Sequence, residues 1–355
     1  MLIYAEPLII CHIVNDFDDA AEQSAARPLD MAGRRGPIRA GERVQLTDYK
    51  GKMHTIVLHD NGHFHSHRGT FSHSEIIGCE DGSVITTSTG HDFLVLRPLL
   101  SDYVMGMPRG AAVIYPKDAA QIIGWADIFP GARVVEAGVG SGALSMSLLR
   151  AIGEGGRLIS VERREDFAEI AQLNVDGWFG RRHPAWEVRI GDVADVLTSL
   201  PAHSIDRVVL DMLAPWENID AARHALVPGG LLLAYVATTT QMSRLVEDIR
   251  DTQAFTEPQA WETMHRGWHL EGLAVRPDHR MVAHTGFLVT TRVLAPGHHT
   301  PRRARRPAKG AYAGEDVWNP EDVGERPISE RKIRRVRRDL QERAQFIESV
   351  EREDD

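Results

Sequence analysis

Short apolar runs alternate with stretches of helical periodicity from about residue 115 onwards. Five of these runs are strand-like and nearly continuous in apolar side chains. They cover residues 134–135, 158–161, 188–190, 208–210 and 231–236, and helices are expected at about 142–152, 165–179, 217–226 and 239–253. Strands and helices that alternate in this way form a parallel sheet covered on both faces. The pattern therefore predicts an α/β fold.

Two later runs, Leu273-Ala274-Val275 and residues 287–291, are expected to close this sheet with an antiparallel hairpin. The sheet would then have seven strands, most of them parallel. We assign residues 101–296 to this α/β domain.

A different pattern occupies residues 37–100. Apolar and polar residues alternate over 43–47, 53–58, 83–87 and 93–96, with turn residues such as Gly51 and Gly90 between the runs. Short alternating runs at this spacing are typical of a small antiparallel sheet or barrel. We therefore expect a small β-domain in front of the α/β domain.

The two ends of the chain differ from both domains. Residues 1–36 have a mixed composition and form an N-terminal extension, for which order and disorder are both open and in which Met31 is an alternative start. Residues 297–355 begin with a basic linker at 301–310 and continue with a charged helix expected at about 328–350. Basic side chains there can contact RNA phosphates, but a solvated helix explains them equally well.

Composition limits the binding partners and the cellular compartment that can be expected for the protein. The 355 residues carry a net charge of −9, which does not favour nucleic-acid binding overall but leaves room for a local basic face. Two cysteines, Cys11 and Cys79, exclude a disulfide framework and fit a reducing compartment. No apolar run approaches the ~20 residues that cross a bilayer. We expect a cytoplasmic protein without membrane contact.

The strongest chemical signal is a glycine-rich turn where the first strand of the α/β domain meets its first helix. Gly138, Gly140 and Gly142 give the spacing G-x-G-x-G instead of the dinucleotide fingerprint G-x-G-x-x-G. Glu136 precedes the turn and would repel a pyrophosphate but attract the ammonium group of a methionine moiety. The turn therefore favours S-adenosylmethionine over a nicotinamide cofactor. The alternative is a glycine-rich turn without a ligand.

Acidic residues also follow the second and third strands. Glu162 can accept both ribose hydroxyls of a cofactor, or it is a solvated acid at a strand end. Phe167 can cover one adenine face, or it packs between helix and sheet. Asp192 is expected to accept from the adenine amino group. The ends of successive parallel strands meet in one crevice, where ligands of open α/β sheets bind.

The fourth strand ends in Asp211-Met212-Leu213-Ala214-Pro215-Trp216, which suggests a pocket for a planar base with an exocyclic amine. N1 of adenine is neutral and carries a lone pair, and its methylation creates a cation shared with the 6-amino group. A carboxylate that accepts from this amino group increases the nucleophilicity of N1 and stabilises the cation. Asp211 is the candidate for that role, and the alternative is a helix N-cap.

These segments carry a family resemblance from about Gly36 to Gly297. The matching stretches are 36–37, 64–69, 96–105, 107–110, Tyr115-Pro116-Lys117-Asp118, 210–216, 267–268 and 284–288. The chain resembles the tRNA (adenine-58-N1)-methyltransferase family, in particular its actinobacterial branch. The resemblance implies a class I (Rossmann-like) methyltransferase fold, S-adenosylmethionine as cofactor, tRNA as partner and a homotetramer. It implies cofactor contacts at Ser141, Gly142, Ala143, Leu144, Glu162, Phe167, Asp192 and Asp211, and it makes Tyr115 a wall of the adenine pocket.

Three other functions are weighed against this one. Another class I methyltransferase, acting on a protein isoaspartyl group or a small molecule, would not need Tyr115 and Asp211 together. A non-catalytic tRNA-binding subunit would be expected to lose Asp211 or the glycine-rich turn. A nicotinamide oxidoreductase does not fit the glycine spacing. The histidines from His54 to His91 lack a matching set of cysteines or carboxylates, so we expect surface positions and no metal.

Overall fold

The computed structural model describes residues 35–300 together with Arg334 and Arg338. Its contacts divide the chain into two units, residues 1–300 and 301–355. The expected N-terminal extension up to residue 34, the basic linker and nearly all of the charged tail helix lie outside the described residues. Within the part of the chain that is described, no helix has the length and apolar character needed to span a membrane. The expected domain boundaries stay predictions.

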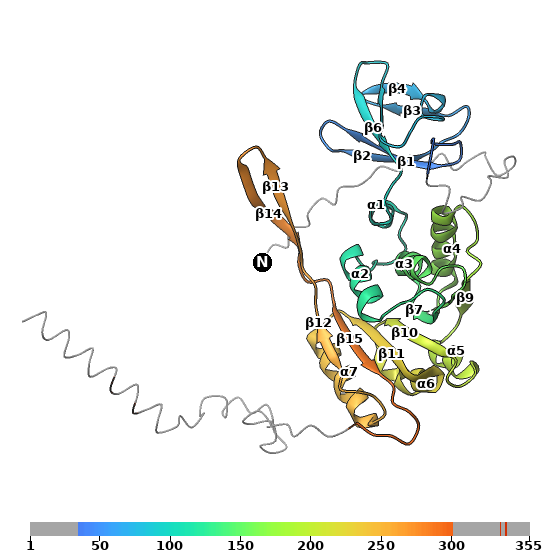
Figure 1. Ribbon diagram of the computed structural model, residues 1–355, viewed down its shortest axis with the longest axis vertical. Coiled ribbons are helices and arrows are strands. Elements are labelled where there is room, and N and C mark those ends of the chain that lie inside the picture. The colour runs from blue at the N-terminus through green and yellow to red at the C-terminus, as the bar shows by residue number, and fades with distance from the viewer. Residues whose placement is uncertain (1–34, 301–333, 335–337, 339–355) are drawn as a thin grey trace, which may run out of the picture. The chain divides into compact units, whose positions relative to one another are not determined.

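The N-terminal β-domain is an antiparallel sheet with a core of its own (Figure 1). The sheet has the order β2 (Met53–Val57), β1 (Arg43–Asp48), β6 (Asp92–Leu96), β5 (Ser83–Thr86). Its buried core includes Val44, Leu46 and Phe93. The four runs predicted from the sequence are these four strands. The sequence pattern missed the hairpin β3 (His63–Ser66) and β4 (Gly69–Ser72) and the 3₁₀ turn η2 (His73–Glu75).

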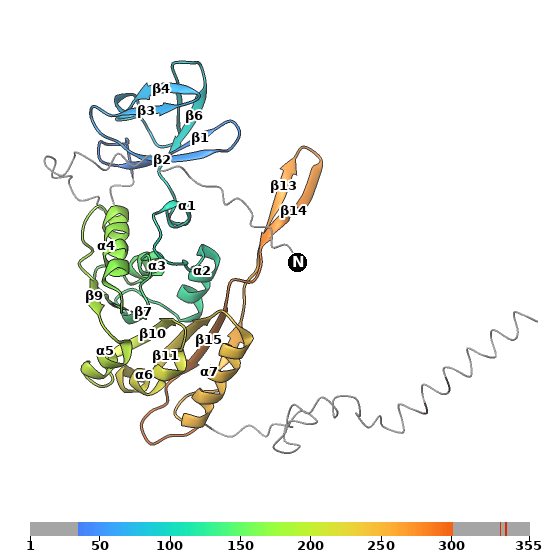
Figure 2. The ribbon, with the colours of Figure 1, turned by 180° about the vertical axis from the view of Figure 1, so that it is seen from behind.

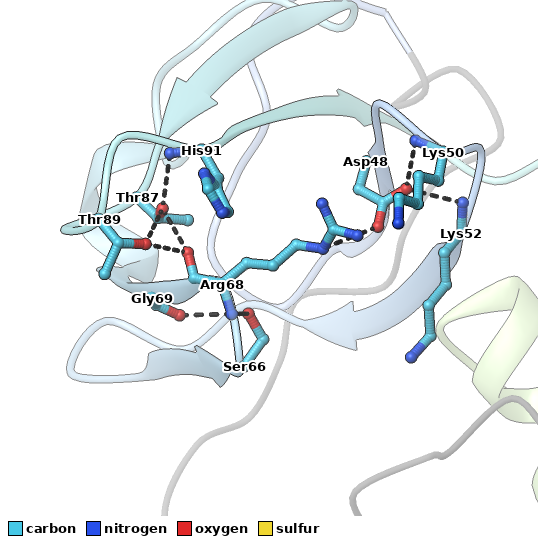
Figure 3. A network of polar contacts seen from close by, with 9 residues as sticks. All are labelled: Asp48, Lys50, Lys52, Ser66, Arg68, Gly69, Thr87, Thr89 and His91. Carbon is cyan, nitrogen blue, oxygen red and sulfur yellow. Dashed lines mark hydrogen bonds and ion pairs between the residues drawn. The ribbon is translucent and has the colours of Figure 1, made fainter.

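A polar network stabilises the inside of the β-domain (Figure 3). Asp48 accepts hydrogen bonds from the backbone N–H groups of Lys50 (2.8 Å) and Lys52 (3.0 Å) and forms an ion pair with Arg68 (3.2 Å). The backbone carbonyl of Arg68 in turn accepts from the Thr87 hydroxyl at 2.6 Å. The network ties β1 to the β3–β4 turn and to the end of β5.

The second domain is built on a seven-stranded sheet with the order β12-β15-β11-β10-β7-β8-β9 (Figure 2). The five predicted parallel strands are present as β7 (Arg133–Ala137), β8 (Arg157–Glu162), β9 (Trp186–Ile190), β10 (Ile205–Asp211) and β11 (Leu226–Val236). Strand β15 (Phe287–Arg292) runs antiparallel to β11, and the edge strand β12 (Gln259–Trp261) pairs antiparallel with β15. The α/β fold with a mostly parallel sheet is confirmed.

Helices cover both faces of this sheet, and successive strand residues alternate between the two cores. Val134 packs with α1 (Leu100–Gly106), α2 (Pro116–Trp125), α3 (Ala143–Ile152) and α4 (Glu165–Phe179). Val135 packs on the other face with α5 (Val193–Ser199), α6 (Ile219–Ala225) and α7 (Thr239–Thr252). A 3₁₀ turn, η3 (Pro215–Asn218), precedes α6. The sequence pattern did not predict α1, α2 and α5, of which α1 and α5 span only seven residues each.

One strand prediction was wrong. Residues Leu273-Ala274-Val275 do not join the main sheet but lie at the tip of a separate hairpin, β13 (His265–Glu271) and β14 (Ala274–Val282), with Gly272 in the connecting turn at φ +53°. The seventh strand of the main sheet is β12 instead. Alternation of apolar and polar residues predicts a strand without saying what covers it. Here Leu273 and Val275 are fully or largely exposed in the described chain.

Candidate active site

A cavity of about 560 Å³ lies at the carboxyl ends of β7, β8 and β10. Five of the predicted site residues line it: Gly138, Gly140, Glu162, Phe167 and Asp211. Ala111, Gly191 and Leu213 are among the other residues of its wall. The place is the one at which open α/β sheets bind ligands. A smaller cavity of about 380 Å³ between α1, α2 and α3 has mostly apolar walls and is separate from these residues.

The glycine-rich turn after β7 is hydrogen-bonded to the ends of the two neighbouring strands, β10 and β8. The backbone N–H of Gly138 donates to the carbonyl of Asp211 at 3.0 Å, and that of Gly140 donates to Glu162 Oε2 at 3.2 Å. A Cβ atom at Gly138 would lie 3.2 Å from Glu162 Oε2. Gly142 precedes α3 in a left-handed conformation with φ +81°. Gly138 and Gly140 line the cavity, so a side chain at either position would reduce the space for a ligand.

Glu162 is held at the cavity by backbone groups on both sides. In addition to the bond from Gly140, its Oε1 accepts from the backbone N–H groups of Arg163 (3.0 Å) and Arg164 (3.2 Å). The carboxylate therefore has a fixed orientation at the end of β8. It remains in the cavity wall, where it can accept from the two hydroxyls of a ribose.

Phe167 lies between the cavity and two covering groups. The Arg164 guanidinium stands 3.6 Å from the centroid of its ring. The backbone of Gly110 also approaches the ring so closely that a Cβ atom there would come within 2.9 Å of it. The ring is thus clamped while it lines the cavity, which suits a flat platform for an adenine.

Asp192 has other partners than those expected. Its Oδ1 accepts from the backbone N–H of Ala194 at 2.8 Å and caps α5, and its Oδ2 bonds to Arg163. The bond from Ala194 and the charge of Arg163 lower the pKa of the carboxyl group. Its neighbours Gly191 and Val193 line the cavity. Asp192 thus lies beside the cavity wall, and its contact with an adenine amino group stays a prediction.

Glu136 lies behind the cavity and not in its wall. Its side chain is buried, and Oε2 accepts from the hydroxyls of Ser145 and Ser160, both at 2.7 Å. Ser160 also accepts from Trp186 Nε1 at 2.8 Å. Burial raises the pKa of Glu136 to about 7, although the two serine hydroxyls lower it. Strand alternation explains this position, because residue 136 faces the same side as Val134, toward α3.

Three more of the predicted cofactor residues are buried beneath the turn. Ala143 and Leu144 pack in the core of α3. The Ser141 hydroxyl accepts from the backbone N–H of Gly110 (3.1 Å), and the Asn174 amide donates to the Ser141 carbonyl (3.0 Å) and the Pro108 carbonyl (2.9 Å). These bonds fasten the segment before α2 onto the glycine-rich turn. Ser141 therefore joins the segment before α2 and helix α4 to the glycine-rich turn without lining the cavity itself.

Asp211 ends β10 opposite Tyr235 of β11 in the parallel register. No described residue donates a hydrogen bond to its carboxylate, and burial raises its pKa to about 6. The N-cap of the following 3₁₀ turn is Ala214, so Asp211 does not cap a helix. Burial also raises the pKa of Tyr235 to about 12, with the negative charges of Asp118 and Asp211 adding to the effect. Sequence reasoning had not identified Tyr235, whose position follows only from strand register.

Tyr115 occupies the N-cap position of α2, next to a buried ionic cluster. Lys117 Nζ donates to Asp118 Oδ1 and to the Thr285 hydroxyl, both at 2.7 Å, and the Thr285 hydroxyl donates to Asp118 Oδ2 at 2.6 Å. The cluster joins the start of α2 to the segment before β15. The cluster therefore holds the backbone next to Tyr115, which is not itself among the residues that line the cavity of about 560 Å³. The place of Tyr115 in the wall of an adenine pocket stays a prediction.

No group of three or more His, Cys, Asp or Glu side chains among the described residues could hold a metal ion. Five of the seven histidines from His54 to His91, including His63 and His65 on β3, are exposed as expected. His73 is an exception, because it is buried in the β-domain and its Nδ1 accepts from the backbone N–H of His59 at 3.1 Å.

The strand order, the glycine-rich turn after the first parallel strand and the acidic residue after the second define a class I S-adenosylmethionine-dependent methyltransferase. Comparison with known proteins narrows the class. Residues 36–85 match the family model TrmI-like N-terminal, and residues 93–277, just over half of the chain, match the model tRNA methyltransferase complex GCD14 subunit. The chain belongs to the tRNA (adenine-58-N1)-methyltransferase family.

Individual relatives agree with this assignment. The tRNA (adenine(58)-N(1))-methyltransferase TrmI of Thermus thermophilus is 33% identical over 252 residues, which cover 70% of this chain and 95% of the relative. The tRNA (adenine(57)-N(1)/adenine(58)-N(1))-methyltransferase TrmI of Methanocaldococcus jannaschii is 30% identical over 60% of this chain and 83% of its own length.

Solved structures are similar as well. The tRNA (m1A58) methyltransferase TrmI of Aquifex aeolicus superposes with a TM-score of 0.63 at 27% identity, over 73% of this chain and all of its own. A SAM-dependent O-methyltransferase of Thermotoga maritima reaches a TM-score of 0.68 at 29% identity, over 74% of this chain and 96% of its own. The family expected from the sequence is therefore confirmed, and a nicotinamide oxidoreductase is excluded.

Proposed function

We propose that this protein transfers a methyl group from S-adenosylmethionine to N1 of adenine 58 in the T-loop of tRNA and so forms 1-methyladenosine. The observation that carries the proposal is Asp211, a carboxylate in the wall of the cavity that no described residue contacts with a hydrogen-bond donor. A partly buried carboxylate without a donor is available to a ligand, and a pKa raised by burial is typical of a functional site.

The cavity residues fit the cofactor. Gly138 and Gly140 leave backbone surface free, Glu162 offers a fixed acceptor for ribose hydroxyls, and Phe167 offers a clamped ring. S-adenosylmethionine, when bound, supplies an electrophilic methyl group on a sulfonium centre. The buried Glu136 does not line the cavity but stabilises the elements around it, because its bonds to Ser145 and Ser160 join β7 to α3 and β8.

Asp211 and Tyr115 bind and orient the adenine in this proposal. Asp211 accepts a hydrogen bond from the 6-amino group, which orients N1 and increases its electron density. Methylation places a positive charge on the ring, and the nearby carboxylate stabilises this charge more in the transition state than in the ground state. Tyr115 provides a face for stacking. Tyr235, opposite Asp211 in the sheet, keeps its phenol neutral because its pKa is about 12.

The two remaining alternatives have less support. A non-catalytic subunit would not need a free carboxylate in the cavity, and this chain retains both Asp211 and the glycine-rich turn. A protein or small-molecule methyltransferase would not need the segment from Tyr115 to Asp118, which the Lys117–Asp118–Thr285 cluster holds in place.

The direct experiment maps the methylated positions in tRNA incubated with the pure protein and labelled cofactor. We expect label at N1 of adenine 58, and the Asp211→Ala variant serves as the matched control for contaminating activity. Label at another position type, such as a guanine or a uridine carbon, contradicts the proposal.

We further propose that the protein assembles as a homotetramer in the cytoplasm. The hairpin β13–β14 pairs only with itself in the described chain, and Trp268 and Leu270 are 58% and 73% exposed on it. An isolated two-stranded hairpin with exposed apolar side chains is marginal in water, so a second copy is the natural cover. Sedimentation should give a tetramer for the wild type and smaller species for Leu270→Asp. Leu173→Asp, at the 67% exposed Leu173 of α4, is the control and should leave the assembly intact.

A further inference from the structure

Leu213 is an exposed apolar side chain at the mouth of the cavity. It is 81% exposed, although it lies two residues after Asp211 and belongs to the cavity wall. Among the described residues with large exposed apolar side chains, only Leu213 lines this cavity. Its exposure is therefore a local property of the active site and not of the general surface.

The loop around Leu213 is anchored on both sides. Pro215 and Asn218 are buried, and the Asn218 amide lies 3.4 Å from the sulfur of Met212, which packs into the core. The Leu213 carbonyl accepts a hydrogen bond from Gln241 Nε2 at 2.9 Å. The same Gln241 closes the capping box of α7. The backbone at Leu213 is thus fixed by bonds to two elements while its side chain points away from both cores.

A positive charge lies next to this loop. The Arg244 guanidinium of α7 stands 4.3 Å from the centroid of the Trp216 ring, and its side chain is 59% exposed and forms an ion pair with Asp248 at 3.6 Å. Neither Arg244 nor Trp216 is among the residues that line the cavity. An exposed cation beside an aromatic ring can contact a phosphate of a bound nucleotide.

The proposed substrate needs such a projection. N1 lies on the pairing edge of adenine, so the base must leave its stack and its partner before it reaches Asp211. Unstacking costs free energy, and proteins that open base steps often insert an apolar side chain into the gap. Leu213 lies at the rim of the pocket that receives the base, where the gap in the RNA would be.

We propose that Leu213 is the wedge that takes the place of adenine 58 in the tRNA stack while the base lies in the pocket. This inference rests on the proposed function. Leu213 acts on the opening of the RNA and not on the methyl transfer itself. Its contribution is therefore large for a base that is stacked and paired, and small for a base that is already free.

The experiment compares two substrates in single-turnover methylation with saturating protein. One is the folded tRNA, and the other is the same tRNA with abasic residues in place of the nucleotides that stack on adenine 58 and pair with it. Leu213→Ala should be about tenfold or more slower than the wild type on the folded tRNA and less than about threefold slower on the abasic tRNA. Leu213→Met should restore most of the rate, and Leu173→Ala should have no effect. Binding of S-adenosylhomocysteine, followed by calorimetry, should be equal in wild type and Leu213→Ala.

Two results would overturn the wedge. An unchanged rate of Leu213→Ala on folded tRNA shows that no side chain is needed there. An equal loss on both substrates shows that Leu213 shapes the pocket instead of opening the RNA. Failure of the wild type to methylate adenine N1 in either substrate counts against the proposed function itself and is thus separate from both results.

Discussion

Asp48 in the β-domain and Asp211 in the methyltransferase domain are carboxylates withdrawn from water in opposite surroundings. Burial alone would raise the pKa of Asp48, but the backbone bonds from Lys52 and Lys50 and the charge of Arg68 together lower it. Figure 3 shows these donors around the carboxylate. At Asp211 burial acts without such donors, and the pKa rises to about 6. A carboxylate held by backbone donors and a cation stabilises a fold, whereas one without such partners is available for a substrate.

Replacement of Asp211 should give the largest difference between the effect on activity and the effect on stability. Asp211→Ala should lower turnover by about 10²–10³-fold, the range for losing one preorganised electrostatic partner. The variant should be about as stable as the wild type, because it removes a partly buried carboxylate to which no described residue donates a hydrogen bond. Single-turnover methylation and urea unfolding measure the two quantities. Calorimetry should show only a modest loss of S-adenosylhomocysteine binding, since Gly140 and Glu162 are retained.

Asp48→Ala should give the reverse result. Its removal leaves Arg68 buried without its ion-pair partner, and we expect the free energy of unfolding to fall by about 3 kcal/mol. Turnover at saturating tRNA should stay near that of the wild type below the melting temperature. A loss of turnover with unchanged stability would contradict the structural role of this carboxylate. Arg68→Met in the same background should recover part of the stability, because the double variant has no uncompensated charge.

Glu136 lies between these two cases, since its Oε2 has two serine donors while burial still raises its pKa to about 7. Because the pKa of Glu136 is higher in the folded than in the unfolded protein, its protonated carboxyl contributes its full stabilisation below pH 4.5, the ordinary pKa of the group. This contribution decreases as the pH rises from 4.5 toward 7. Wild-type stability should therefore fall over this window by about 2 kcal/mol more than that of Glu136→Gln. Urea unfolding at the two ends of the window measures the difference. Parallel pH curves for the two proteins would show that folding leaves the pKa of Glu136 at its ordinary value.

Much of the fold could be predicted from the sequence because parallel strands buried on both faces are nearly continuous in apolar residues. Strands β7, β8, β10 and β11 follow that rule. The tip residues Leu273 and Val275 have the same kind of pattern but are exposed. A pattern records which side chains are apolar, while what covers them depends on tertiary or quaternary contacts. The short helices α1 and α5 were not predicted, because seven residues are too few to show a clear helical periodicity.

The candidate site shows a similar limit. Residues at strand ends, such as Glu162 and Asp211, could be placed from the order of strands and helices alone. Glu136 was expected to meet the cofactor, but it sits one residue inside β7 on the face toward α3. Tyr235 was missed because its position opposite Asp211 depends on the register between β10 and β11. Register is set by non-local pairing and is not written in either strand by itself.

The central claim is that the ionised carboxylate of Asp211 promotes methylation, and the pH dependence of single-turnover methylation tests it most directly. The wild-type rate should rise with pH through about 6 and become level above it, because only the ionised form accepts from the 6-amino group. Asp211→Asn, which retains the shape and an acceptor oxygen, should be slower by about 10²-fold and independent of pH over the same range. A near-normal rate of the Asn variant, or a wild-type rate that does not change across pH 6, would contradict the account.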